Sequence, residues 1–220
     1  MKSPDELKQL AEQLSCPKDD AGIDIAHVMH ESNIGMTRQA IDALAIRDGD
    51  AVLELGHGSC RHLPELLSRA ADVSYCGLEI STLMQAEARV FNADAVAAQV
   101  ASFHLYDGAV IPFPVRSFDK VLTVNTLYFW RDPVDLLRQI QALLRPGGSL
   151  AISFADKAFM QSLPFTAYGF TLYDKAQVAA LAREAGFAQV SFSEHRERIK
   201  SKAGDEVDRL FHVAKLTRLD

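Results

Sequence analysis

The chain has 220 residues, of which 48% are hydrophobic and 24% are charged, and its formal net charge is −6. A chain of this length and composition can bury a complete core, which excludes a disordered, collagen-like or coiled-coil protein. The negative charge argues against a protein that binds nucleic acid through bulk charge, so no nucleic-acid partner is expected.

No apolar run approaches the roughly 18 residues that a membrane span requires. The chain begins M-K-S-P-D-E-L-K-Q-L, which is too polar for a secretory signal. The three cysteines form no C-x-x-C pair. We therefore expect a reduced protein of the cytoplasm, without a membrane span.

The predicted elements begin with a short amphipathic helix over residues 4–14. Residues 16–22 contain a proline and a glycine and are predicted to break it. A second helix is predicted over residues 36–44. We interpret residues 1–45 as an N-terminal helical lid segment and residues 46–220 as the main domain.

Short apolar strands then alternate with amphipathic helices, which indicates βαβ units and a mainly parallel sheet covered on both faces. Ligands bind such sheets at the carboxyl ends of the strands. The loops after residues 55, 79, 105, 125 and 154 are therefore expected to form the site. The predicted strands are residues 51–55, 73–78, 100–105, 118–124, 149–154, 187–193 and 210–216, and the predicted helices are 61–71, 81–98, 132–144 and 174–185.

The most informative segment reads E-L-G-H-G-S-C and begins at Glu54. Gly56 permits a tight turn from strand to helix, and Gly58 lets a ligand approach the backbone closely. Glu79 ends the next predicted strand, where a carboxylate can accept hydrogen bonds from both hydroxyls of a ribose. A glycine turn alone would indicate only a turn, but the turn, helix, strand and acid together predict a nucleoside site.

The residue three positions after Gly58 helps to distinguish between the possible nucleoside cofactors. A dinucleotide fingerprint has a small residue there, whereas this chain has Arg61. No tyrosine is followed by a lysine four residues later. Both observations weaken the interpretation as a nicotinamide-dependent oxidoreductase, which stays open as one alternative. A non-catalytic nucleoside-binding module is another alternative.

Four motifs in order over residues 51–154 resemble class I S-adenosylmethionine-dependent methyltransferases. V-L-E-L-G-H-G resembles the first motif of that family, and G-L-E-I-S resembles its ribose-binding acid. D-G-A-V-I-P-F-P-V-R-S-F-D, from Asp107, and L-L-R-P-G-G-S-L, from Leu143, are similar to segments of the small-molecule subgroup related to ubiquinone and menaquinone biosynthesis. Cys60 departs from the pattern, because the family has a third glycine there.

The resemblance implies a doubly wound, Rossmann-like α/β fold with a mainly parallel seven-stranded sheet and an antiparallel C-terminal strand. It implies S-adenosyl-L-methionine as the cofactor and a small molecule, apolar or aromatic, as the methyl acceptor. It places Gly56 and Gly58 at the methionine part and Glu79 at the ribose. The other implied cofactor contacts are Glu54 at the amino-acid end, Ile80 and Asp107 at the adenine, Gly108 beside them, and Asn125 after the fourth strand.

The acceptor pocket is expected beneath segments rich in aromatic residues, which suit an apolar acceptor. Tyr128 follows a strand-end loop and is expected in the pocket wall. Only His30 and Tyr128 are put forward as candidate bases, and the catalytic residues otherwise stay open. His27 and His30 lack a third ligand, so no metal site is predicted. The basic residues of 196–202 are interpreted as a solvated hairpin approach.

Overall fold

The fold is known from a computed structural model that describes residues 2–200 and 206–219. Its seven-stranded sheet has the order β3-β2-β1-β4-β5-β7-β6. Strands β1 to β5 are parallel, whereas β7 is antiparallel to both β5 and β6, which confirms the predicted fold class. The strands are β1 (Ala51–Leu55), β2 (Ser74–Glu79), β3 (Ala101–Leu105), β4 (Phe118–Val124), β5 (Leu144–Ala155), β6 (Gln189–Lys200) and β7 (Glu206–Thr217).

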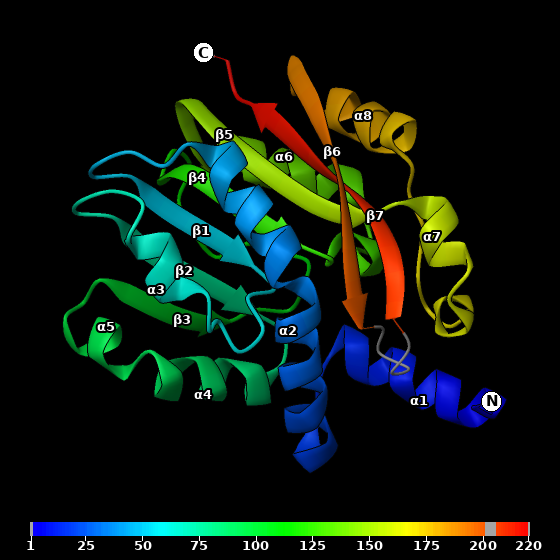
Figure 1. Ribbon diagram of the computed structural model, residues 1–220. Helices are drawn as coiled ribbons and strands as arrows, with labels where there is room; N and C mark the ends of the chain where they lie inside the picture. Colours follow the sequence, from blue (N-terminus) through cyan, green and yellow to red (C-terminus); the bar gives the residue numbers. More distant parts are fainter. Residues whose placement is uncertain (1, 201–205, 220) are drawn as a thin grey trace.

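Helices cover both faces of the sheet (Figure 1). α2, α3 and α4 lie on one face, and α6 and α8 lie on the other, while α1 and α7 lie near the carboxyl ends of the strands. The helices are α1 (Pro4–Ser15), α2 (Asp19–Leu44), α3 (Leu63–Leu67), α4 (Thr82–Phe91), α5 (Ala93–Ala97), α6 (Pro133–Leu143), α7 (Lys157–Gln161) and α8 (Lys175–Glu184), with 3-10 turns η1 (Leu127–Phe129) and η2 (Pro164–Ala167). No helix in the described ranges has the length and apolar character needed to cross a membrane.

Helices α4 and α6, which follow strands β2 and β4, begin at the capping residues that the sequence predicts. Ser81 Oγ accepts a hydrogen bond from the Met84 amide at the start of α4. Asp132 accepts one from the Asp135 amide at the start of α6, where Pro133 occupies the first turn. Because each cap satisfies an orphan amide, the loops that precede α4 and α6 end at fixed positions.

The N-terminal prediction is wrong in one respect: the second helix begins at Asp19, not at residue 36, and only Cys16–Lys18 separate it from α1. The turn signals of residues 16–22, which include Gly22, predicted the break. A glycine costs only about 1 kcal/mol within a helix, and both glycines of α2 serve close packing, Gly22 against Leu83 and Gly35 against Glu197. The buried second half of α2 packs on β4, β5 and β7, so this part of the predicted lid segment belongs to the sheet core.

Other boundaries also differ from the prediction. The helix predicted over 81–98 divides at Asn92, whose side-chain amide donates to the carbonyls of Ala88 (2.9 Å) and Cys60 (3.1 Å). Residues 61–71 form only the short α3, and β5 begins at Leu144. The closing hairpin is longer than predicted, so the basic residues 196–200 lie within β6. Residues 201 and 202 lie outside the described residues.

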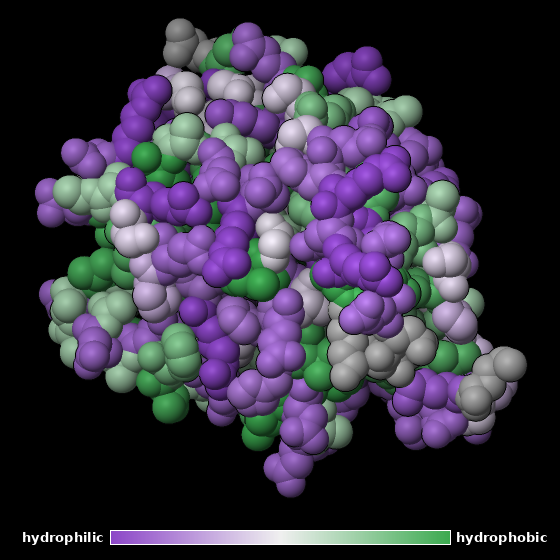
Figure 2. All heavy atoms as spheres, in the orientation of Figure 1, coloured by the Kyte–Doolittle hydropathy of each residue, from purple (hydrophilic) through white to green (hydrophobic). Residues whose placement is uncertain are grey.

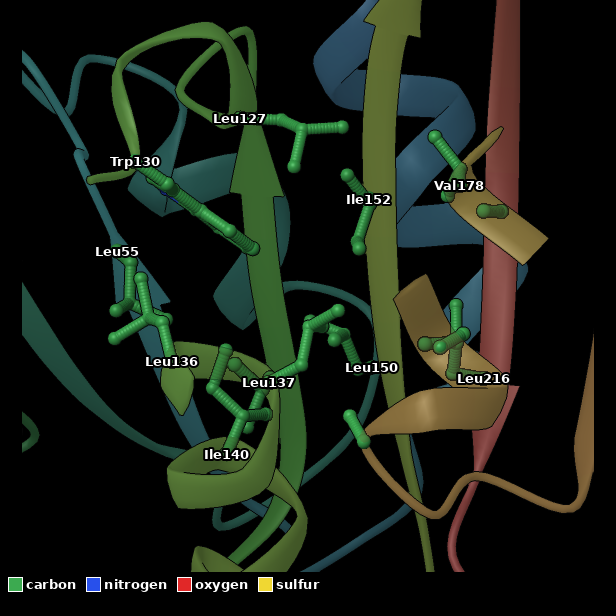
Figure 3. Close-up of a cluster of buried hydrophobic side chains, with 14 of the residues drawn as sticks. Leu55, Leu127, Trp130, Leu136, Leu137, Ile140, Leu150, Ile152, Val178 and Leu216 are labelled. Carbon is green, nitrogen blue, oxygen red and sulfur yellow. The ribbon is translucent and has the colours of Figure 1, made fainter. Parts of the chain in front are cut away.

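The core has two layers, one on each face of the sheet. Leu136, Leu137 and Ile140 of α6 pack with Leu150 and other side chains of the first layer (Figure 3). Met36, Ala40, Ile41 and Leu44 of α2 join the second layer. The outer face of α2 and the β6 edge are mainly hydrophilic (Figure 2). The sheet is therefore held rigidly on both sides, with its carboxyl edge left to form a site.

Candidate active site

A cavity of about 540 Å³ lies at the carboxyl edge of the sheet. Residues from all five predicted loops line it, among them Gly56, Ile80, Gly108, Asn125 and Ala155. Residues of α1, α7 and η2 close the cavity on the side away from the sheet. The strand ends therefore converge on one cavity, as the doubly wound topology requires.

The glycine turn after β1 forms one wall of this cavity. Gly56 has φ +72°, and a Cβ there would collide with the side chain of Thr126. Gly58 has φ +55°, and a Cβ there would meet no heavy atom within 4 Å, so its backbone is open to a ligand. Cys60 has φ +48°, which is the left-handed conformation that favours glycine. The positive φ explains why the family pattern has a glycine at this position. In this chain the position is occupied by a cysteine with a small, buried side chain.

The Glu79 carboxylate joins the glycine turn to the start of α4. Its Oε2 accepts a hydrogen bond from the Gly58 amide (2.9 Å), and its Oε1 accepts from the amides of Ile80 (2.8 Å) and Ser81 (3.1 Å). A carboxylate has about four acceptor sites, so Oε2 keeps one for a ligand hydroxyl. Only 5% of Glu79 is exposed, and it lines the cavity.

Ile80 and Gly108 line the cavity together with Glu79, whereas Asp107 is exposed next to Gly108 and does not itself line the cavity. A Cβ on Gly108 would lie 3.4 Å from Ile80 Cγ2, so the two residues face each other closely. Ile80 is 39% exposed, which leaves an apolar surface for a flat ring. Asp107 Oδ1 accepts hydrogen bonds from the Val110 and Ala109 amides, which hold the pKa of this exposed carboxyl below its ordinary value. Its Oδ2 stays available to an amino group.

Asn125 and Tyr128 belong to the cavity wall at the end of β4. Tyr128 donates a hydrogen bond to Asn125 Oδ1 (3.0 Å) and accepts one from the Ala155 amide (2.7 Å). Burial raises the pKa of the Tyr128 hydroxyl. The hydroxyl is thus occupied by protein groups and poorly suited to accept a substrate proton. Its ring, packed against Phe129 and Phe170, forms the wall that the sequence predicts.

Glu54 lies in a buried cluster behind the glycine turn. Its Oε2 accepts hydrogen bonds from His62 Nε2 (2.8 Å) and from the Tyr75 hydroxyl (2.6 Å), and Cys60 Sγ donates to Tyr75 (3.2 Å). Burial alone would raise the pKa of Glu54, but His62 and Tyr75 outweigh it and hold that pKa below its ordinary value. Burial likewise opposes the charge on His62, yet Glu54 raises the His62 pKa. The cluster is a buried ion pair that braces the turn.

The same cluster is the only group of metal-ligand side chains found among the described residues, formed by Glu54, Cys60 and His62. Their hydrogen bonds already satisfy one another, and burial together with Glu54 raises the Cys60 pKa well above its ordinary value. A thiol held in its neutral form is a poor metal ligand. The sequence does not reveal the contact between Glu54 and Tyr75. It forms because the strands that carry them, β1 and β2, are neighbours in the sheet.

His30 lines a smaller, adjoining cavity of about 70 Å³ together with His57, His62 and Glu54, and the two cavities share Gly56, Gly58 and Met84. His30 does not line the main cavity, so the structure does not place this candidate base beside the expected acceptor. Burial, and then the neighbouring His62, lower the pKa of His30. His57 lies buried between Gly77 and Phe103, and burial lowers its pKa as well.

Arg209 lines the main cavity, but the sequence analysis does not single it out. It comes from β7, where it lies on the same face as the buried Phe211 and Val213. Only 4% of Arg209 is exposed. A charged residue on the inward face of an apolar strand is a signal that could have revealed it.

The geometry defines a nucleoside-binding protein with a Rossmann-like sheet, and comparison with known proteins supports a narrower class. Residues 53–152 match the family model described as a methyltransferase domain. An uncharacterized methyltransferase, YdaC, of Bacillus subtilis is 30% identical over 133 residues, covering 60% of this chain and 70% of the relative. The 27-O-demethylrifamycin SV methyltransferase of Amycolatopsis mediterranei is 31% identical, covering 59% of this chain and 47% of the relative.

Solved structures agree on the fold. A putative methyltransferase of Haloferax volcanii, solved in complex with the Trm112 activator, has a TM-score of 0.71 at 19% identity and covers 91% of this chain and 96% of its own. A phosphoethanolamine methyltransferase of Haemonchus contortus has a TM-score of 0.71 at 16% identity and covers 100% of this chain and 61% of its own.

The chain belongs to the class I S-adenosylmethionine-dependent methyltransferases, and S-adenosyl-L-methionine is its cofactor. The narrower resemblance to the ubiquinone- and menaquinone-related subgroup stays a prediction.

Proposed function

We propose that this enzyme transfers the methyl group to a small, largely apolar or aromatic molecule that is enclosed beneath α1, α7 and η2. The observation that carries the proposal is the composition of the cavity wall contributed by α1, η1 and residues 159–170. This wall is built from Leu10 and Leu14 of α1, Tyr128, Phe129, Phe159, Met160, Leu163, Phe165 and Phe170. Such a wall stabilises an apolar ligand by removing its surface from water.

The residues of the other end fit the cofactor. We infer that Glu79 binds a ribose hydroxyl through its remaining acceptor site. Ile80 and Gly108 would enclose the adenine, and Asp107 would accept from its amino group. The open backbone at Gly58 leaves room for the methionine part, because nothing lies where its Cβ would be. We assign Glu54 a bracing role behind this turn, since His62 and Tyr75 engage its carboxylate.

The chain contributes mainly alignment and the exclusion of water. When bound, the cofactor supplies a methyl group on a sulfonium, which is already activated for transfer. The rigid strand ends hold the donor side, and the aromatic wall holds the acceptor side, so that two reactants meet in a fixed orientation. The apolar lid keeps water from competing. Among the described residues that line the cavity there is no histidine or aspartate, so an acceptor that needs no side-chain base fits best.

The proposal is tested by incubating the enzyme with S-adenosylmethionine and separate panels of small apolar molecules, transfer RNA and proteins. Mass spectrometry would follow both S-adenosylhomocysteine and the methylated product. We expect product only from small molecules with an apolar or aromatic body. Methylation of RNA or protein, with none of the small-molecule panel, would refute the proposed acceptor class and leave the methyltransferase assignment intact.

A further inference from the structure

Arg209 is placed where it can meet the acceptor. It lines the main cavity together with Asn33 of α2 and the aromatic wall. Its charge lies close enough to Tyr128 to act against the rise in the pKa of that hydroxyl. Arg209 lies on β7 just beyond the pairing of β7 with the end of β5, three strands along the sheet from β1 and its glycine turn, and we therefore place it at the acceptor end.

The guanidinium is held firmly, with one donor to spare. Nε and Nη2 both donate to Glu197 Oε1, at 3.1 and 2.6 Å, and Nη2 also donates to the carbonyl of Ser32. Nη1 donates one hydrogen bond, to Asn33 Oδ1 (3.2 Å). A guanidinium has five N–H groups, so one Nη1 hydrogen has no partner among the described residues. A group fixed in this way loses little freedom when it binds a ligand.

The charges around the cavity make Arg209 distinctive. Among the described residues that line it, the ionised side chains are Lys2, Glu79 and Arg209. Lys2 lies exposed ahead of α1, and Glu79 serves the nucleoside end. Glu197, the counter-ion of Arg209, keeps 22% of its side chain exposed, against 5% for Arg209. Water therefore screens the carboxylate more than the guanidinium, and the acceptor end keeps a net attraction for anions.

We propose that Arg209 is a specificity residue that selects acceptors carrying a carboxylate on an apolar or aromatic body. The inference rests on the proposed small-molecule function and deepens it. An acceptor carboxylate would take the spare Nη1 hydrogen in a charge-assisted hydrogen bond. Carboxylates are already ionised at neutral pH, which agrees with a cavity wall that offers no side-chain base at this end.

The test uses two fluorescent probes of the same aromatic shape, anilinonaphthalene sulfonate, which is an anion, and phenylnaphthylamine, which is neutral. Both are titrated against the 220-residue protein saturated with S-adenosylhomocysteine, so that the nucleoside end is filled. The sulfonate stands in for the carboxylate as an aromatic anion. Arg209→Gln is combined with Glu197→Gln so that no buried charge is left unpaired. The matched control is Arg198→Gln, a neighbour on β6 with 72% of its side chain exposed.

We expect the double variant to bind the anionic probe about tenfold more weakly, since it loses one charge-assisted hydrogen bond. The neutral probe should bind within about twofold of the wild type. Glu197→Gln alone should bind the anion more tightly, whereas the Arg198→Gln control should change neither probe. Benzoate should displace the anionic probe from the wild-type protein more effectively than from the double variant. Benzamide, which is neutral, should show no such difference.

Two outcomes would overturn the inference. If both probes weaken together, Arg209 only holds the wall in place. If the anion binds equally well to all variants, the guanidinium does not face the ligand. These results differ from a failure of the proposed function, in which neither probe would bind the wild-type protein at all.

Discussion

The two ends of the cavity are built in different ways. At the nucleoside end, Glu79 is the last residue of β2, Gly56 and Gly58 follow β1, and backbone amides fix the carboxylate. At the acceptor end, side chains converge from α1, α2, η1, η2 and β7, which are far apart in the sequence. The first end is rigid and polar, whereas the second is apolar, with a single buried cation.

This difference separates cofactor binding from acceptor choice. The nucleoside end depends on turns whose geometry follows from short motifs, so it can be kept while the lid changes. The acceptor end depends on the shape and charge of a lid that packs on a common sheet. Substitutions at one end should therefore leave ligand binding at the other end nearly unchanged.

The largest expected effect is at Glu79. Glu79→Lys should weaken binding of S-adenosylhomocysteine at least about 100-fold, because it replaces the hydroxyl acceptor with a cation. Isothermal titration calorimetry would measure it. Glu184→Lys, on an exposed part of α8, is the control for the charge change. Glu79→Gln, which keeps a carbonyl acceptor, should lose less. Wild-type affinity in a folded Glu79→Lys protein would show that Glu79 does not hold the ribose.

The brace beneath the glycine turn should matter next, and its effect should depend on pH. The folded pKa of His62 is raised above its ordinary value of 6.5, so its stabilising contribution is complete at lower pH and is lost as the pH rises through the raised value. His62→Ala should cost about 3 kcal/mol of unfolding free energy near pH 6 and less near pH 9. Urea unfolding measures both.

The control for this variant is His27→Ala, which alters an exposed histidine of α2. It should shift the unfolding free energy by at most about 0.5 kcal/mol at either pH. A His62→Ala effect that is the same at both pH values would mean that the Glu54–His62 pair is not ionised in the folded protein.

A smaller effect is expected at the acceptor end. Phe170 packs its ring against Phe129, Tyr128 and Phe165, with centroids 4.6, 5.8 and 5.7 Å away. Phe170→Ala should weaken binding of the neutral probe about tenfold, because it removes these ring contacts from the cavity wall. Binding of S-adenosylhomocysteine should stay within about twofold. Equal losses for both ligands would show that the two ends are coupled. Phe91→Ala, on the outer side of α4, is the control.

The smallest effect is expected at Asp107. Its carboxylate is exposed, so water competes with any ligand hydrogen bond and reduces its contribution. Asp107→Asn should weaken S-adenosylhomocysteine about threefold in calorimetry. A loss comparable to that of Glu79→Lys would place Asp107 at the centre of nucleoside recognition instead of at its edge.

The sequence predicts local features best. The caps at Ser81 and Asp132 and the strand before the glycine turn need only a few neighbouring residues, so their patterns could be recognised. The start of α2 was missed because residues 16–22, with Pro17 and Gly22, were interpreted as a break. Packing against Leu83, which is distant in the chain, outweighs the low helix propensity of Gly22.

The residues of the candidate site also fall into two groups, those that the sequence could place and those that it could not. Glu79, Gly58 and Ile80 could be placed from spacing and resemblance because parallel strands end at one edge. The contact of Glu54 with His62 and Tyr75, and the position of Arg209 in the cavity, could not be placed. Both depend on which strands become neighbours and on which face each side chain takes.

By itself, the sequence determined the class of fold, the strand-end turns and the position of the acid that ends β2, because short-range sterics and hydrogen bonding specify these features. Only the tertiary structure decided which side chains enclose the acceptor, where the buried ion pairs lie and which candidate base stays outside the main cavity. These features follow from long-range packing, in which the free energy of burying distant segments together outweighs local preference.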